Sequence, residues 1–109
     1  MADMFRERPW PFEGHRFPDD LGVAVMRTVL SDEARALEVT HFPDNSWGIT
    51  DGGDPNVEDA LTVTHLWHVL RLDPSLHVLA LLPPGWVAVR DRRDGPWSLA
   101  SFRWQDDPP

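Results

Sequence analysis

The sequence predicts a small α+β domain, an antiparallel sheet of four or five strands with a short helical pair packed on one face. The longest apolar stretch, 61–90, contains clear helix start and stop signals and ends in a strand-like alternation. Short runs with strand periodicity, separated by turn residues, lie on both sides of it. With 109 residues one domain is expected. We place it at 23–102, after an extended proline- and aromatic-rich arm (1–22) and before a flexible tail (103–109).

The helical pair is predicted from the chain around Asp73 and Pro74. A carboxylate before the first turn can accept hydrogen bonds from its free N–H groups, and proline at the first helical position loses none. Apolar residues then occupy nearly every side of the helix, so we expect it to be deeply buried. Pro83-Pro84-Gly85 ends it. A shorter helix at 66–72, with Thr64 as its N-cap, precedes it.

The strands are predicted from residue alternation and from turn signals. The first run is apolar on both sides, as expected of a central strand. The second and third are joined by so short a turn that they should pair antiparallel, and Asp94-Gly95 marks a final hairpin. In the fifth run we expect Val87 and Val89 to face the core. The predicted strands are 23–30, 37–42, 47–50, 86–91 and 97–102, and 60–64 is either a further strand, which we favour, or the first turn of the helix that follows.

The N-terminal arm holds Pro9, Pro11 and Pro18 among four aromatic side chains. Proline at this density prevents a regular helix. Exposed aromatic surface is costly, so we expect the arm to lie on its own domain. An arm exchanged between two subunits is the alternative, and both a monomer and a homodimer remain open.

Composition excludes several classes of function. A net charge of −8 repels phosphate backbones, so nucleic acid is not an expected partner. The chain has no cysteine, which excludes disulfides and thiolate sites, and no apolar run of membrane-spanning length. The first residues lack the apolar segment of a signal peptide, which predicts a cytoplasmic protein. All ten basic residues are arginine, and we expect Arg90 to form a structural ion pair with Asp73 or Asp91.

A set of short motifs resembles a family of small, uncharacterised bacterial proteins, a domain of unknown function. Related groups have been proposed as immunity proteins of bacterial toxin systems. The resemblance covers about 20–100 and implies a small cytoplasmic α+β protein that binds a partner; it carries over no catalytic residue. The motifs are His41-x2-Asp44-x2-Trp47, Asp73-Pro74-Ser75-Leu76, Leu82-Pro83-Pro84-Gly85, and Ala88-x-Arg90 with Trp97.

The favoured function is that of a non-enzymatic protein-binding module without a cofactor. An acidic surface would engage a basic partner and speed encounter, while exposed tryptophans would slow release. Trp47 stands beside the acidic loop and Trp67 on the polar side of its helix, so we expect both to be exposed. The predicted partner-binding residues are Asp44, Trp47, Asp51, Asp54, Glu58, Asp59 and Trp67.

Histidines supply the alternative, a small metal-dependent or small-molecule-binding enzyme. His65 and His68 are three residues apart, so on a helix they would share one face, as metal ligands often do. His41 could join them from a neighbouring strand. The competing interpretation gives these side chains ordinary capping and surface roles. The spacing of acids in 51–59 does not match a calcium-binding loop, so we expect a solvated turn there.

Overall fold

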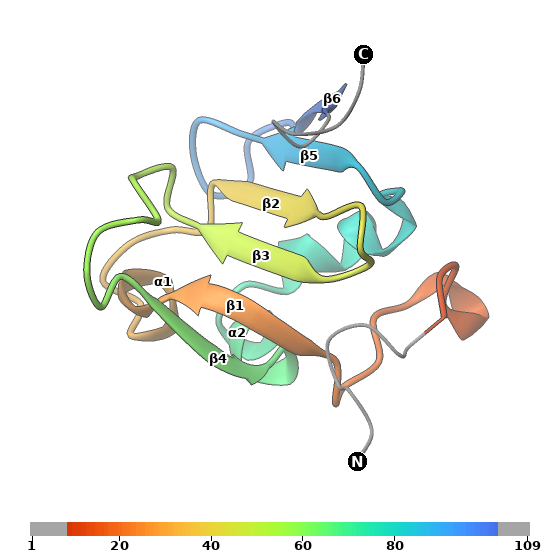
Figure 1. Cartoon of the computed structure of the whole chain (residues 1–109), viewed down its shortest axis with the longest axis horizontal. Coiled ribbons are helices and arrows are strands. Elements are labelled where there is room, and N and C mark those ends of the chain that lie inside the picture. Colours follow the sequence, from red (N-terminus) through yellow and green to blue (C-terminus); the bar gives the residue numbers. More distant parts are fainter. Residues whose placement is uncertain (1–8, 103–109) are drawn as a thin grey trace.

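The computed structural model describes residues 9–102 and has a six-stranded sheet with helices on one face (Figure 1). The first eight residues of the predicted arm and the predicted tail lie outside the described residues. None of the described helices is long and apolar enough to cross a bilayer. The elements are η1 (Glu13–His15), β1 (Gly22–Met26), α1 (Arg27–Leu30), β2 (Glu38–His41), β3 (Trp47–Thr50), β4 (Leu61–His65), α2 (Trp67–Leu72), η2 (Pro74–Leu81), β5 (Trp86–Val89) and β6 (Ser98–Ser101).

The strand order is β4-β1-β3-β2-β5-β6, with β1 and β3 parallel and all other neighbours antiparallel. The α+β class is therefore confirmed, but the sheet is mixed and has one strand more than the upper number predicted. The mixed sheet arises at 27–37, where α1 and the loop after it connect β1 to β2 and leave room for one strand between them. Strand β3 occupies that position. Strand β3 thus separates β1 from β2, and the β2–β3 hairpin itself pairs antiparallel as predicted.

The first predicted strand is too long. It ends at Met26, and 27–30 form the short helix α1 instead. Residues apolar on both sides fit a buried strand and a buried helical turn equally well, so alternation could not locate this boundary. Val29 of α1 is buried, and the N–H of Arg27 donates to the carbonyl of Ala60, which ties the helix to the start of β4.

The helical layer begins as predicted at the Asp73–Pro74 pair. The side chain of Asp73 accepts a hydrogen bond from the N–H of Ser75, and η2 follows directly. The helix ends before Gly85, whose φ of 82° is unstrained only without a side chain. Thr64 is not an N-cap, because it belongs to β4 and α2 starts after Leu66 without a side-chain cap.

Burial of η2 is one-sided rather than complete. Leu76, Leu79 and Ala80 are buried against the sheet, whereas Val78 and Leu81 are exposed. The layer is one helix deep, so the side of η2 that turns away from the sheet meets solvent. The expectation of a deeply buried helix is wrong on that side.

The facing of β5 is also opposite to the prediction. Ala88 and Arg90 are buried, whereas Val87 is half-buried and Val89 is exposed. The prediction turned the two valines toward the core because they are apolar, but a buried arginine decides which side of β5 faces the core. Arg90 lies on the helix side because its guanidinium pairs with Asp73, at the start of η2.

Arg90 is held by partners from three separate segments. Its Nε donates to the carbonyl of Ala36 at 3.0 Å, Nη1 donates to Oγ of Ser75 at 2.8 Å, and Nη2 pairs with Asp73. The guanidinium also lies 4.2 Å from the ring centroid of Trp97. Burial raises the pKa of Asp73, but hydrogen bonds from Ser75 and Arg90 outweigh it, so the pKa lies below its ordinary 3.8. The structural ion pair is confirmed, with Asp73 as the partner.

The described part of the arm packs on the domain of its own chain. Phe12 and Phe17 are buried in the core, and Nε1 of Trp10 donates to the carbonyl of Ala80 in η2 at 3.0 Å. These contacts close the core beneath the helical layer, so the arm contributes core residues that the predicted domain boundary at residue 23 left out.

Candidate functional site

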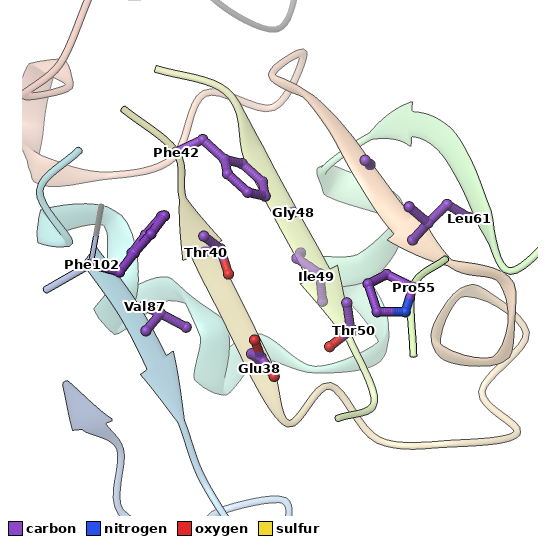
Figure 2. A pocket seen from close by; sticks show the side chains of 11 residues that line it. Glu38, Thr40, Phe42, Gly48, Ile49, Thr50, Pro55, Leu61, Val87 and Phe102 are labelled. Carbon is purple, nitrogen blue, oxygen red and sulfur yellow. The ribbon is translucent and has the colours of Figure 1, made fainter. Parts of the chain in front are cut away.

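Within residues 9–102, no helix covers the face of the sheet opposite α2 and η2, and this uncovered face contains a hollow of about 320 Å³ (Figure 2). Side chains from the outward side of β2, β3 and β5 form its floor, while the flanks come from the β3–β4 loop, the start of β4 and the residue after β6. Most of these groups are apolar. The lining residues are Ala24, Glu38, Thr40, Phe42, Gly48, Ile49, Thr50, Pro55, Leu61, Val87 and Phe102.

The hollow has an aromatic end and an acidic end. Phe42 and Phe102 meet edge to face, with ring centroids 6.3 Å apart, at one end. Glu38 lies at the other end, near Thr50 and Pro55 (Figure 2). Glu38 and Phe42 are four residues apart along one extended strand, so the two ends are separated by about 13 Å. A bound group can therefore contact apolar rings and a carboxylate at once.

The carboxylate of Glu38 forms no hydrogen bond and no ion pair with any residue between 9 and 102, although the side chain is half-buried. A carboxylate without a partner is stabilised by a cationic or N–H donor. The acidic end of the hollow is thus suited to a positively charged group from outside the chain.

Gly48 keeps the floor of the hollow open. A Cβ atom at this position would lie 3.0 Å from Cε2 of Phe42, which is tighter than ordinary van der Waals contact. Any side chain there would push the Phe42 ring or fill the space beside it. The absence of a side chain at Gly48 therefore helps to set the shape of the aromatic end.

The predicted acidic loop borders the hollow at its Glu38 end. Thr50 pairs with Glu38 across β3 and β2, and the loop continues from there through Pro55, which lines the hollow. Asp51 accepts hydrogen bonds from Thr28 Oγ1 and the Gly53 N–H, so its carboxylate shapes the loop. The other loop acids are exposed: Asp54, Glu58 and Asp59.

Three of the predicted partner-binding residues do not join this loop. Asp44 lies in the β2–β3 turn, at the opposite end of the hairpin, where its carboxylate accepts from the N–H and Oγ of Ser46. Trp47 is only 3% exposed, so the expected surface anchor is a core residue. Trp67 is half-buried on α2, on the helix side of the sheet, where Arg71 lies over its ring. The prediction that all seven residues lie on a single surface is therefore wrong.

Trp47 is buried because the aromatic arm and a histidine close over it. Its ring is stacked on His41, with centroids 3.9 Å apart, and it contacts Phe12 and Phe17. The sequence position beside a polar turn indicated exposure, but strand alternation places it with Ile49 on the covered side.

The three candidate histidines lie apart, and the structure gives no metal site within 9–102. No group of three or more histidine and acidic side chains in that range could hold an ion. His41 is fully buried, with Nδ1 2.7 Å from the Leu82 carbonyl and Nε2 2.7 Å from Asn45 Oδ1. Burial lowers its pKa below the ordinary 6.5. His65 is exposed on β4, and His68 is stacked on Trp67.

Comparison with known proteins adds nothing to this geometry. No family model, curated protein or solved structure matches the chain. The resemblance to a family of small bacterial proteins, and the immunity role it implies, therefore remain predictions. Function has to be argued from the hollow itself.

Sequence reasoning missed the hollow, although one signal was present. In 38–42 the order Glu-Val-Thr-His-Phe places Glu38, Thr40 and Phe42 on one side of a strand. A glutamate and a phenylalanine on the same strand face indicate a surface of mixed character. This surface was not recognised because the sequence prediction turned Val87 toward the core instead.

Proposed function

We propose that the protein is a non-enzymatic protein-binding module that receives a basic segment of a partner protein on the uncovered face of its sheet. The observation that carries this proposal is Glu38, a half-buried side chain at one end of an apolar hollow whose carboxylate has no ion-pair or hydrogen-bond partner within 9–102. A hollow of about 320 Å³ is at the lower end of the volumes that hold small ligands, and suits one or two side chains.

A long basic side chain fits both ends of the hollow. The aliphatic stem of arginine or lysine packs on apolar surface while its charged head stays at a polar site. Here the stem would lie along Thr40 and Val87, and the head would reach Glu38. A neighbouring apolar residue of the partner would contact the Phe42 and Phe102 rings, which gives the contact an aromatic anchor.

Charge beyond the hollow supports a basic partner. The net charge of the chain is −8, and the exposed acids of the β3–β4 loop stand beside the Glu38 end. Such a field raises the association rate of an oppositely charged partner and weakens with added salt. An immunity-type role in the cytoplasm, with a basic toxin as the partner, is one form of this proposal, and it is motivated by the sequence resemblance.

Nuclear magnetic resonance with a model peptide tests where a basic segment binds. The probe is a short peptide of alternating arginine and leucine, titrated into ¹⁵N-labelled protein. We expect the largest amide shifts at Glu38, Thr40, Phe42 and Gly48, and small shifts on α2. A peptide of alternating glutamate and leucine, with the same apolar content, should leave these signals unchanged.

Two charge-matched variants separate a specific contact from general attraction. Glu38→Gln removes the carboxylate in the hollow, while Glu13→Gln removes one from the exposed η1 turn. Both change net charge by one unit, so only the first should reduce the shifts around the hollow. Shifts that are centred on α2, or that respond equally to both variants, would contradict the proposal.

A further inference from the structure

The outer edge of β4 is a candidate interaction surface that adjoins the hollow at Leu61. Strand β4 is the last strand on its side of the sheet and pairs only with β1 among the described strands. Its backbone groups on the outer side have no ladder partner between residues 9 and 102. An edge of this kind accepts another strand, because unpaired N–H and C=O groups in a row act as a template.

The register of β4 identifies the groups that point outward. The Arg27 N–H donates to the Ala60 carbonyl, and the Leu66 N–H donates to the Leu21 carbonyl. Hydrogen-bonded and non-hydrogen-bonded pairs alternate in an antiparallel ladder, so Thr62 and Thr64 face β1. The N–H and C=O groups of Leu61, Val63 and His65 therefore point away from the sheet.

Nothing within β4 blocks a second strand. Proteins protect exposed edges with charged side chains, proline or bulges, and the five residues Leu-Thr-Val-Thr-His contain none of these. Val63 is 58% exposed and Leu61 is exposed beside it. The opposite edge, β6, is a residue shorter and follows Pro96 closely.

We propose that β4 pairs antiparallel with β4 of a second copy of this chain, with Val63 opposite the same residue of the partner copy. In this register the outward N–H and C=O groups of Leu61 exchange hydrogen bonds with those of His65 in the other copy. Thr62 then stands beside Thr64 of the other copy, a β-branched cross-strand pair that is favourable in sheets.

Charge at the two ends of β4 favours the second copy in this orientation. Glu58 and Asp59 lead into the strand and are exposed, while Arg71 stands on the helix that follows it. Antiparallel pairing turns the acidic end of one copy toward the end of β4 in the other copy, where α2 begins, and keeps the two acidic ends apart. The contact is short, so the dimer is weak and rapidly exchanging.

Sedimentation velocity over about 10 µM to 1 mM tests the dimer. We expect the average mass to rise from 12.4 kDa toward twice that value. Val63→Lys should weaken association at least about tenfold, because a charged residue in the centre of an edge strand opposes pairing. Val57→Lys is the matched control, since Val57 is 59% exposed in the neighbouring loop and should leave the dimer unchanged.

Hydrogen exchange at low and high protein concentration gives a second readout that needs no variant. Amides of Leu61, Val63 and His65 should exchange rapidly in dilute protein and slow at least about tenfold in concentrated protein. Those of Thr62 and Thr64 should be protected at both. A mass that stays at one chain throughout, or a dimer that Val63→Lys leaves intact, would overturn the proposal without affecting the hollow.

Discussion

The covered and uncovered faces of the sheet are made by alternate residues of the same strands. On β2, Val39 and His41 point into the core, whereas Glu38 and Thr40 point into the hollow. On the covered face every charged group in the core has a partner, as Asp73 has in Arg90. On the uncovered face Glu38 has none within 9–102.

This difference separates stability from binding. The buried charged pair on the covered face is satisfied inside the molecule, so changes there should cost stability. The side chains on the uncovered face are apolar or have no partner within 9–102. Changes to them should therefore cost little stability and much binding. Under the proposed function, one face supplies the order of the sheet and the other supplies the binding contacts, so each face can be altered separately.

The largest contrast is expected between two carboxylates. Asp73→Asn removes the charge opposite the buried Arg90, and breaking a buried pair costs about 3–5 kcal/mol of the free energy of unfolding. Glu38→Gln should change it by less than about 0.5 kcal/mol. Urea unfolding of both variants at neutral pH measures the difference, and equal losses would contradict the contrast between the faces.

Acidic pH should remove the stability that the charge of Asp73 contributes. The folded pKa of Asp73 lies below 3.8, so its stabilisation is present above pH 3.8 and is lost as pH falls through the folded pKa. The difference in unfolding free energy between the wild type and Asp73→Asn should therefore shrink below pH 3.8. A difference that stays constant across that range would show that the carboxylate does not act through its charge.

A pair of valines gives the next contrast. Val25 is fully buried on the covered face, and Val25→Ala should cost about 2–3 kcal/mol through lost burial and a residual cavity. Val89 is exposed on the other face, and Val89→Ala should change stability by less than about 0.5 kcal/mol. Thermal unfolding of both proteins checks this, and a larger loss for Val89 would reverse the assignment of the faces.

His41 should link stability to pH near neutrality. Its folded pKa lies below 6.5 because of burial, so the unfolded chain binds a proton first as pH falls. Stability is complete above pH 6.5 and declines as pH drops toward the folded pKa. His41→Gln should lose about 1–3 kcal/mol at pH 7 and flatten this decline.

The matched control for that substitution is His77→Gln. His77 is exposed on η2, so its replacement should retain the wild-type decline between pH 6.5 and acid. Unfolding free energies measured at a series of pH values compare the three proteins. An equally steep decline in His41→Gln and the wild type would assign the effect to another group.

Gly48→Ala should have a small effect on stability and a clear effect on the hollow. The added Cβ meets Phe42 at 3.0 Å, at the end of a side chain that can move, so we expect less than about 1 kcal/mol of destabilisation. The displaced ring should weaken binding of the arginine–leucine peptide. Unchanged affinity would show that the aromatic end takes no part in the contact.

The fold was largely predictable where local chemistry decides it. The Asp73–Pro74 start, the β2–β3 turn and β4 depend on residues adjacent in sequence, and the structure has all three. The parallel pairing of β1 with β3 was not predictable, because it depends on a strand inserted later in the chain. The facing of β5 was missed since the partner that buries Arg90 comes from a separate element.

The candidate site was predictable only in its charge. Acids of the β3–β4 loop do border the hollow, but Trp47 packs into the core against a histidine and the arm. A polar neighbour in sequence does not determine which side of a strand a residue occupies. Glu38 drew no attention because a single glutamate in a strand is ordinary until its surroundings are known.

Isothermal titration of the arginine–leucine peptide into the wild type and Glu38→Gln tests the central claim most directly. Loss of a charge-assisted hydrogen bond at the end of the hollow should lower the affinity for Glu38→Gln about tenfold or more, while Glu13→Gln binds as the wild type does. The same affinity for the wild type and Glu38→Gln would contradict the account.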